Sequence, residues 1–182
     1  MSAKSRTGQT AEIAGPTKAN IFPNGDVAAA LIAKAKRPLF VVGSHSVKSE
    51  TNDGDLVDSA IRAMKNPKLS VVATGHLVGE FRKRGVDQAN SLSLFVLGKY
   101  LSDPEWKGFD GKGAYDTVVF MGFAYYMEWL VESGLKNFAM KLQTVSLDRA
   151  YQPNAKWSLG WMPESDWKES IEIIVSRLEE EA

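Results

Sequence analysis

The side chains of this chain that could do chemistry directly follow apolar runs. Gly43-Ser44-His45-Ser46, Thr74-Gly75-His76 and Gly122-Phe123 each come after such a run, and a fourth run ends on Asp148. Glycine lets a ligand approach the backbone, and threonine and histidine can donate hydrogen bonds. An aspartate at a strand end can bind a ribose or ribityl hydroxyl. This set of residues indicates binding of a nucleotide or a flavin.

Each of these residues also has a purely structural interpretation, and the sequence leaves both open. After Gly43 the second glycine of the G-x-G-x-x-G phosphate fingerprint is absent, so the segment can equally be a plain turn. No carboxylate that would orient His45 or His76 is identifiable, which favours a structural role for both. The aromatic side chains after Gly122 could stack on a flavin, but core packing is favoured. Asp148 could equally form a local ion pair or cap.

Composition excludes several other classes of function. The 182 residues include 22 Lys and Arg and 22 Asp and Glu, so the formal net charge of zero argues against nucleic acid as the partner. The absence of cysteine excludes a disulfide, a thiol nucleophile and cysteine-ligated iron–sulfur clusters, and two histidines cannot build a histidine-rich metal site. We therefore expect no catalytic residue and no metal ligand.

The same composition bears on location and association. No signal peptide and no span long enough to cross a bilayer is evident, so a cytoplasmic protein without a membrane partner is expected. A net charge near zero removes mutual repulsion, which suits life in a complex, and homo-oligomers of the isolated chain are a further expectation.

The elements that must position the candidate residues alternate along the chain. Apolar runs without period-two alternation are typical of strands buried on both faces, and helical stripes lie between them. The pattern predicts an α/β protein, a Rossmann-like three-layer α/β/α sandwich over residues 21–182 with a parallel sheet. Strands are expected at 38–42, 69–74, 115–121 and 140–147, and helices at 27–36, 55–64, 77–84, 92–102 capped by Asn90, 124–133 ending at Gly134, and from Ser165 onward.

The remaining segments are expected to be irregular. Residues Met1–Asn20 predict a flexible or partner-ordered arm. The stretch from Asp148 to Pro163 holds Trp157 and Trp161, which favour a protein interface slightly over a cover for the sheet edge. Glu179–Glu181 at a helix carboxyl end predict fraying there.

Two segments carry a family resemblance. Asp103-Pro104-Glu105-Trp106-Lys107-Gly108-Phe109-Asp110-Gly111-Lys112-Gly113 is the first, and Leu147-Asp148-Arg149-Ala150-Tyr151-Gln152-Pro153-Asn154-Ala155 is the second. With Ala35–Gly43, Val72–His76 and Ser133–Lys136, they make the chain from about Ile21 onward resemble the epsilon subunits of archaeal acetyl-CoA decarbonylase/synthase, part of its carbon monoxide dehydrogenase component.

The resemblance implies a fold, a partner and a role. The fold would be that of the FAD-binding central domain of thiamine-diphosphate enzymes, with a six-stranded parallel sheet. The partner would be the carbon monoxide dehydrogenase alpha subunit, a nickel–iron–sulfur protein, in an alpha-two epsilon-two assembly. The role would be non-catalytic: stabilising alpha, with electron transfer to FAD as a further function. A stand-alone flavin- or nucleotide-binding electron carrier is the alternative.

Carried over by position, the flavin site of such domains implies a cofactor cleft in this chain. Phe123-Ala124 stands where those domains often have an arginine, and the first loop lacks their extra glycines. The residues that the resemblance places around the cleft are Gly43, Ser44, Thr74, Gly75, His76, Gly122, Phe123 and Asp148.

Overall fold

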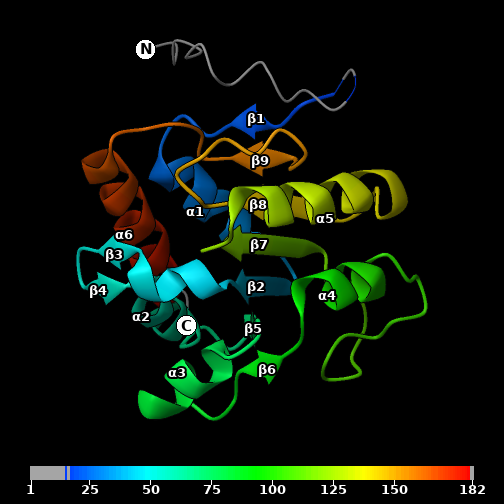
Figure 1. Ribbon diagram of the computed structural model, residues 1–182, viewed down its shortest axis with the longest axis horizontal. Coiled ribbons are helices and arrows are strands. Elements are labelled where there is room, and N and C mark those ends of the chain that lie inside the picture. The colour runs from blue at the N-terminus through cyan, green and yellow to red at the C-terminus, as the bar shows by residue number, and fades with distance from the viewer. Residues whose placement is uncertain (1–14, 16, 181–182) are drawn as a thin grey trace.

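A seven-stranded, all-parallel sheet forms the centre of the protein in a computed structural model that describes residues 15 and 17–180 (Figure 1). The strands follow the order β1-β9-β8-β7-β2-β5-β6. Their bounds are β1 Asn20–Ile21, β2 Pro38–Val42, β5 Ser70–Ala73, β6 Asn90–Ser91, β7 Thr117–Met121, β8 Gln143–Ser146 and β9 Trp157–Ser158. A separate antiparallel pair joins β3 (Glu50–Thr51) to β4 (Gly54–Asp55).

The order of the strands reverses beside β2. From β2 the chain moves first to β5 and β6 on one side, and then returns to β7, β8 and β9 on the other. In parallel sheets such a reversal leaves two loops diverging at the carboxyl ends of neighbouring strands. Here those are the loops after β2 and β7, which pair in register from Pro38 with Thr117 to Val42 with Met121.

Six α-helices and one 3₁₀-helix accompany the strands in the described part of the chain. They are α1 Gly25–Ala33, η1 Ser44–Lys48, α2 Leu56–Ala63, α3 Leu77–Lys83, α4 Leu94–Leu101, α5 Tyr125–Phe138 and α6 Glu164–Glu180. None of these helices is both long and apolar enough to cross a membrane.

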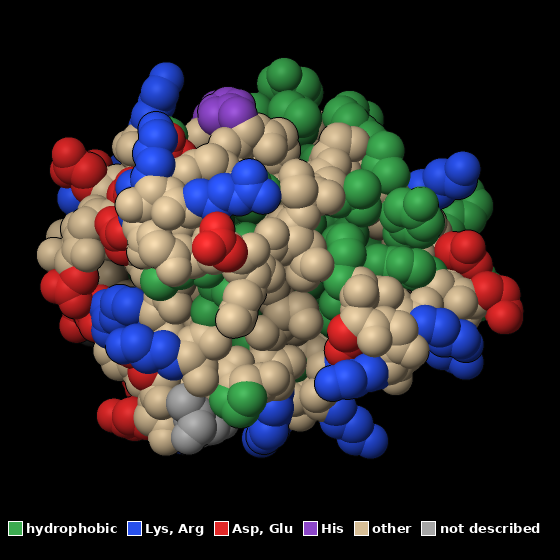
Figure 2. All heavy atoms as spheres, turned by 90° about the horizontal axis from the view of Figure 1, so that it is seen from below, with side chains coloured by type: hydrophobic (Ala, Val, Ile, Leu, Met, Phe, Trp, Pro, Cys, Tyr) green, Lys and Arg blue, Asp and Glu red, His purple; other side chains and the backbone are tan. Residues whose placement is uncertain are grey.

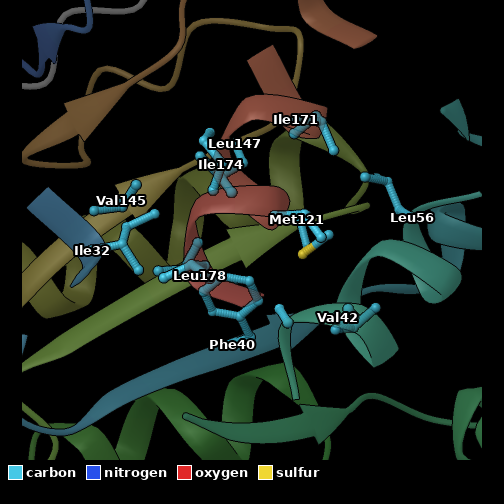
Figure 3. Packing of buried hydrophobic residues seen from close by; sticks show 14 of the residues in the cluster. Ile32, Phe40, Val42, Leu56, Met121, Val145, Leu147, Ile171, Ile174 and Leu178 are labelled. Carbon is cyan, nitrogen blue, oxygen red and sulfur yellow. The ribbon is translucent and has the colours of Figure 1, made fainter. Parts of the chain in front are cut away.

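The two faces of the sheet are covered unequally. Alternate residues of β2 divide between them, because Phe40 and Val42 pack with α1, α2, α3 and α6, whereas Leu39 and Val41 pack with α4 and α5. Figure 3 shows Ile171, Ile174 and Leu178 of α6 over the first face. Within residues 17–180, the second face thus has two helices, supplemented by the aromatic residues of the 103–115 loop.

Several predictions are confirmed and others are corrected. The α/β class, the layers and the four long strands are as expected, but the sheet has seven strands rather than six. The two-residue strands β1, β6 and β9 carry no apolar run, so no pattern announces them. Asn90 lies in β6 and does not cap α4, which begins after Ser93. Helix α5 continues through Gly134 to Phe138.

The predicted N-terminal arm, Met1–Asn20, lies mostly outside the described residues. Of its described part, Ala19 is buried and accepts a hydrogen bond from the Tyr151 hydroxyl. Asn20 pairs with Trp157 between β1 and β9.

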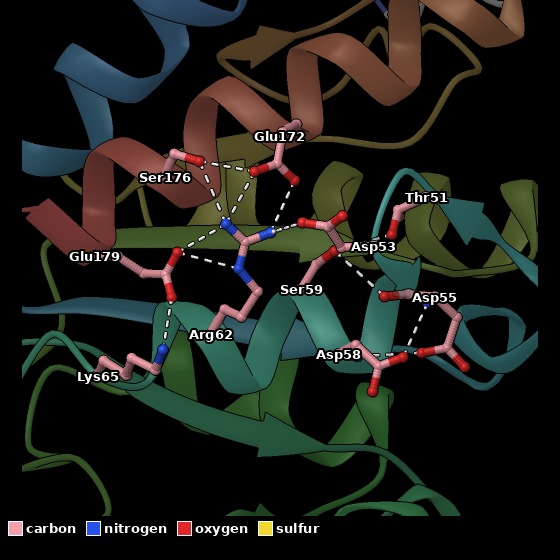
Figure 4. A network of polar contacts seen from close by, with 10 residues as sticks. All are labelled: Thr51, Asp53, Asp55, Asp58, Ser59, Arg62, Lys65, Glu172, Ser176 and Glu179. Carbon is pink, nitrogen blue, oxygen red and sulfur yellow. Dashed lines mark hydrogen bonds and ion pairs between the residues drawn. The ribbon is translucent and has the colours of Figure 1, made fainter.

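A charged network fixes α6 against α2 and engages Glu179, the first of the three glutamates at which fraying is predicted. Glu181 lies outside the described residues. The Arg62 guanidinium donates to both carboxylate oxygens of Glu172, at 2.8 and 2.9 Å, and to Glu179 at 2.7 and 3.0 Å (Figure 4). Lys65 donates to the other Glu179 oxygen at 2.9 Å. These bonds lower the pKa of both glutamates and raise the pKa of Arg62. They offset the unfavourable helix dipole at Glu179.

Replacing Arg62 should therefore destabilise the protein in a pH-dependent way. Arg62→Met leaves Glu172 and Glu179 without their main partner, and we expect a loss of about 2 kcal/mol at pH 7 in urea unfolding. Because the folded-state pKa values are lowered, this stabilisation is present above the ordinary glutamate value of 4.5 and is lost as the pH falls below it. Lys65→Met, an exposed single pair, should cost under about 1 kcal/mol. Equal losses at pH 7 and pH 3 would contradict this account.

Candidate functional site

The loops after β2 and β7 close directly onto one another at the carboxyl edge of the sheet. The Gly43 amide donates to the Met121 carbonyl at 2.8 Å, and the His45 amide donates to the Gly122 carbonyl at 2.9 Å. Parallel pairing of β2 with β7 brings both loops to the same edge. The pairing thus continues beyond the strands into the turns.

The two glycines are required by this approach. A Cβ atom on Gly43 would lie 2.3 Å from the Gly122 carbonyl oxygen and 2.6 Å from the Phe123 ring. A Cβ atom on Gly122, which has a φ of +75°, would lie 1.9 Å from the Ser46 hydroxyl and 2.8 Å from its amide nitrogen. Backbone packing within the chain therefore explains Gly43 and Gly122 without any ligand.

Asp148 occupies the amides that such a turn would offer to an anion. Its carboxylate accepts hydrogen bonds from the Gly122 amide at 2.6 Å and from the Phe123 amide at 3.0 Å. Backbone amides exposed beyond a strand and before a helix are a common binding place for phosphate. In this protein the carboxylate of the chain itself fills that place.

Behind Asp148 lie two buried glutamates, Glu128 and Glu132, which sequence reasoning missed. Both side chains are completely buried on the sheet-facing side of α5. Burial, together with the charges of Asp148 and Glu132, raises the pKa of Glu128 well above its ordinary value. Burial and the Asp148 charge likewise raise the pKa of Glu132. The Glu128 carboxyl group therefore favours its protonated, neutral form more strongly than an exposed glutamate does.

The charge on Asp148 is balanced from several sides. Burial raises the pKa of Asp148, whereas hydrogen bonds from Glu128, Gly122 and Phe123 and the nearby His45 imidazole lower it. Among the described residues, no group of three or more histidine, aspartate and glutamate side chains can hold a metal ion. The cluster is accordingly a buried group of acids in which Asp148 holds the turn after β7.

The segment between β8 and β9 covers these acids. Residues 151–155 are all buried although they form no helix or strand. The Gln152 side-chain amide donates to the Tyr125 carbonyl at 3.1 Å, and the Asn154 amide donates to the Trp129 carbonyl at 3.2 Å, one turn further along α5. The remaining side-chain oxygens of Gln152 and Asn154 have no hydrogen-bond partner in the described part of the chain. The Leu147–Ala155 motif thus packs against α5 on the side that carries the buried acids.

The other predicted site residues lie apart from this cluster. Thr74 is buried and donates to the Val42 carbonyl at 3.1 Å, so its hydroxyl is used within the sheet. Gly75 and His76 are exposed beside β5, on the other side of β2 from Asp148. Ser44 is exposed at the start of η1. The structure brings together Gly43, Gly122, Phe123 and Asp148, and leaves Thr74, Gly75 and His76 separate.

Two small crevices open at this edge. One, of 190 Å³, is lined by His45, Phe123, Asp148 and Trp161 among others. The adjoining one, of 290 Å³, is lined by Lys48, Ser49, Glu50, Asp148, Arg149, Glu164 and Trp167. A larger hollow, of 510 Å³, lies away from the edge beside the carboxyl end of α5.

The two tryptophans expected at an interface have different surroundings. Trp157 lies in β9 and stacks on Phe22 with the ring centroids 4.9 Å apart, so it covers the edge of the sheet. Trp161 is 48% exposed and lines the smaller crevice.

These observations define an α/β protein with an all-parallel sheet, crevices at its carboxyl edge and an acid cluster beneath one of them. The model of the family described as "CO dehydrogenase beta subunit/acetyl-CoA synthase epsilon subunit" matches residues 4–175. The chain belongs to this family, which confirms the resemblance seen in its motifs.

Named relatives support the assignment. The chain is 35% identical over 153 residues to the acetyl-CoA decarbonylase/synthase complex subunit epsilon 1 of Methanosarcina barkeri, covering 84% of this chain and 86% of the relative. It is 37% identical over 154 residues to the corresponding epsilon subunit of Methanothrix soehngenii, with 84% and 79% covered. The epsilon subunit of Methanothermobacter thermautotrophicus is 29% identical over 164 residues, with 90% and 91% covered.

The close packing at Gly43 can be tested on the isolated protein without any ligand. Gly43→Ala introduces the clashes with Gly122 and Phe123, so we expect a loss of about 2–3 kcal/mol in chemical unfolding of the isolated protein. Gly79→Ala is the matched control, because nothing lies within 4 Å of its added Cβ. As Gly79 is inside α3, alanine there should stabilise by about 0.5–1 kcal/mol. Unchanged stability of Gly43→Ala would contradict the close approach.

The buried acid makes a separate prediction about pH. Glu128→Gln keeps the shape of the protonated side chain and removes its ionisation. The raised folded-state pKa means that wild type gains stability from Glu128 below its ordinary value of 4.5 and loses it as the pH rises toward the folded-state value. In melting curves from pH 4 to 8, the melting temperature of the variant should therefore rise relative to that of wild type as the pH increases.

The control for this experiment is an exposed glutamate. Glu105→Gln, in the loop after α4, should follow wild type across the pH range. A Glu128→Gln variant whose stability stays parallel to wild type throughout would show that Glu128 ionises normally in the folded state.

Proposed function

We propose that this chain is the epsilon subunit of an acetyl-CoA decarbonylase/synthase complex and that its role there is non-catalytic. The observation that carries the proposal is membership of the family over residues 4–175, together with relatives whose names describe subunits of that complex. The composition supports a non-catalytic role, because a chain without cysteine has no thiolate to ligate an iron–sulfur cluster.

The partner we propose is the carbon monoxide dehydrogenase alpha subunit, the nickel–iron–sulfur protein, in an alpha-two epsilon-two component. Stabilisation of alpha is then a matter of mass action. A subunit that binds only the folded form of its partner stabilises it by about 2.7 kcal/mol at one hundred times the dissociation constant. Hydrogen bonds within the chain fix the loops at the carboxyl edge of the sheet. This suits the role, because a rigid subunit can dock onto its partner without rearrangement.

A second candidate, electron transfer through FAD, is favoured by the crevices at the carboxyl edge. We propose a Rossmann-like relationship to the FAD-binding central domain of thiamine-diphosphate enzymes, in which Gly43, Gly122, Phe123 and Asp148 would meet the cofactor. Lys48, Arg149 and Trp161 line the crevices and offer charge to a pyrophosphate and a ring to a flavin.

Two contacts within the chain oppose the binding of FAD to these residues. For a phosphate to reach the Gly122 and Phe123 amides, the Asp148 carboxylate would have to leave them. The glycine approach between Gly43 and Gly122 leaves no room for a group between the two turns.

Two measurements separate the candidates. When this chain and the alpha subunit are mixed at micromolar concentration, we expect both to elute together in size-exclusion chromatography. Separate elution would contradict the subunit role. When the isolated chain is titrated into FAD, we expect no saturable change in flavin fluorescence below about 1 mM, which corresponds to roughly 4 kcal/mol. Saturation at micromolar concentration would instead favour the electron carrier.

A further inference from the structure

The exposed apolar side chains of this protein are concentrated on one helical layer. Ten large hydrophobic residues are exposed in the described part of the chain, and seven belong to α4, α5 or the residues just after α5. Figure 2 shows hydrophobic side chains gathered on the right of the molecule seen from below, the side on which Figure 1 places α4. The seven residues, here called the α4–α5 face, are Phe95, Val96, Tyr100, Tyr126, Leu130, Phe138 and Met140.

Packing between the two helices makes this layer one structural unit. A Cβ atom on Gly98 of α4 would lie 3.0 Å from the Val131 side chain of α5, so the helices touch at this point. Leu94 and Leu97 face the sheet with Val131 and Leu135. Apolar residues that remain outside on both helices therefore do not serve the core of the chain.

The helices that carry the exposed apolar residues carry few exposed charges. In α4 the only charged residue is Lys99, which is exposed. In α5 the two carboxylates, Glu128 and Glu132, are buried, and Lys136 is half-buried and donates to the Thr17 carbonyl. The opposite layer differs, since α6 carries Glu164, Asp166, Lys168, Glu169, Glu172, Arg177, Glu179 and Glu180. A solvent-exposed helix normally carries such charges, and their depletion around exposed aromatic residues is typical of a protein interface.

We propose that the α4–α5 face docks onto a different protein subunit, one that presents an apolar surface with carboxylates at its rim. This inference rests on the proposed function, because it names the surface through which the subunit enters its complex. A second copy of this chain fits less well. In a self-association through this face Lys99 would find no exposed carboxylate on either helix, because the nearest ones along the chain, Asp103 and Glu105, lie in the loop after α4.

The test uses paired valine substitutions of similar exposure on opposite layers. Val96 on α4 is 42% exposed, and Val27 on α1 is 40% exposed. Full-length Val96→Glu and Leu130→Glu should each weaken binding to the carbon monoxide dehydrogenase alpha subunit about tenfold or more, measured by biolayer interferometry. Val27→Glu should bind within about twofold of wild type. Melting curves that match wild type establish that each variant is folded.

Each other outcome has a defined meaning. If wild type and Val27→Glu bind and both α4–α5 variants bind equally well, the face is wrong while the subunit role stands. If wild type itself does not bind, the proposed function fails and this inference fails with it. If wild type alone forms a dimer in light scattering that Val96→Glu dissociates, the occupant is a second copy and the proposal of a different subunit is overturned.

Discussion

The Asp148 carboxylate, through its hydrogen bonds with the Gly122 and Phe123 amides, organises the carboxyl edge of the sheet. It joins the end of β8 to the turn after β7. That turn also accepts backbone hydrogen bonds from Gly43 and from His45 of η1. Asp148 is half-buried, and its charge is tolerated there because the Gly122 and Phe123 amides solvate it and because burial favours the neutral form of the neighbouring Glu128. The sheet-facing acids of α5, otherwise contrary to helix patterning, are explained by this requirement.

The glycines at the ends of β2 and β7 have a packing role in this protein. Nucleotide-binding α/β proteins use such glycines to let phosphate approach, and the same freedom here lets two turns of one chain approach each other. The carboxyl edge is thereby largely occupied by the chain itself. The most exposed apolar surface lies on α4 and α5 instead, which shifts attention from a cofactor at the edge to a protein on the helical face.

Much of the fold could be predicted from the sequence, because long buried strands such as Pro38–Val42 and Thr117–Met121 are unbroken apolar runs. The two-residue strands could not be, since Asn20–Ile21 and Asn90–Ser91 are set by their neighbours rather than by their own composition. At the candidate site, the sequence indicated Asp148 but not its partner Glu128. A charge at a sheet-facing helix position, among Val131 and Leu135, is the one signal that could have revealed it.

Docking through the α4–α5 face can be measured by amide hydrogen–deuterium exchange of the chain alone and bound to the alpha subunit. We expect binding to slow exchange in α4 and α5, over Leu94–Leu101 and Tyr125–Phe138, while the turns at Gly43–Lys48 and Asp148–Gln152 exchange as they do in the isolated chain. Protection confined to those edge turns, with exchange in α4 and α5 unchanged, would contradict docking through the α4–α5 face. It would indicate a binding site at the carboxyl edge of the sheet.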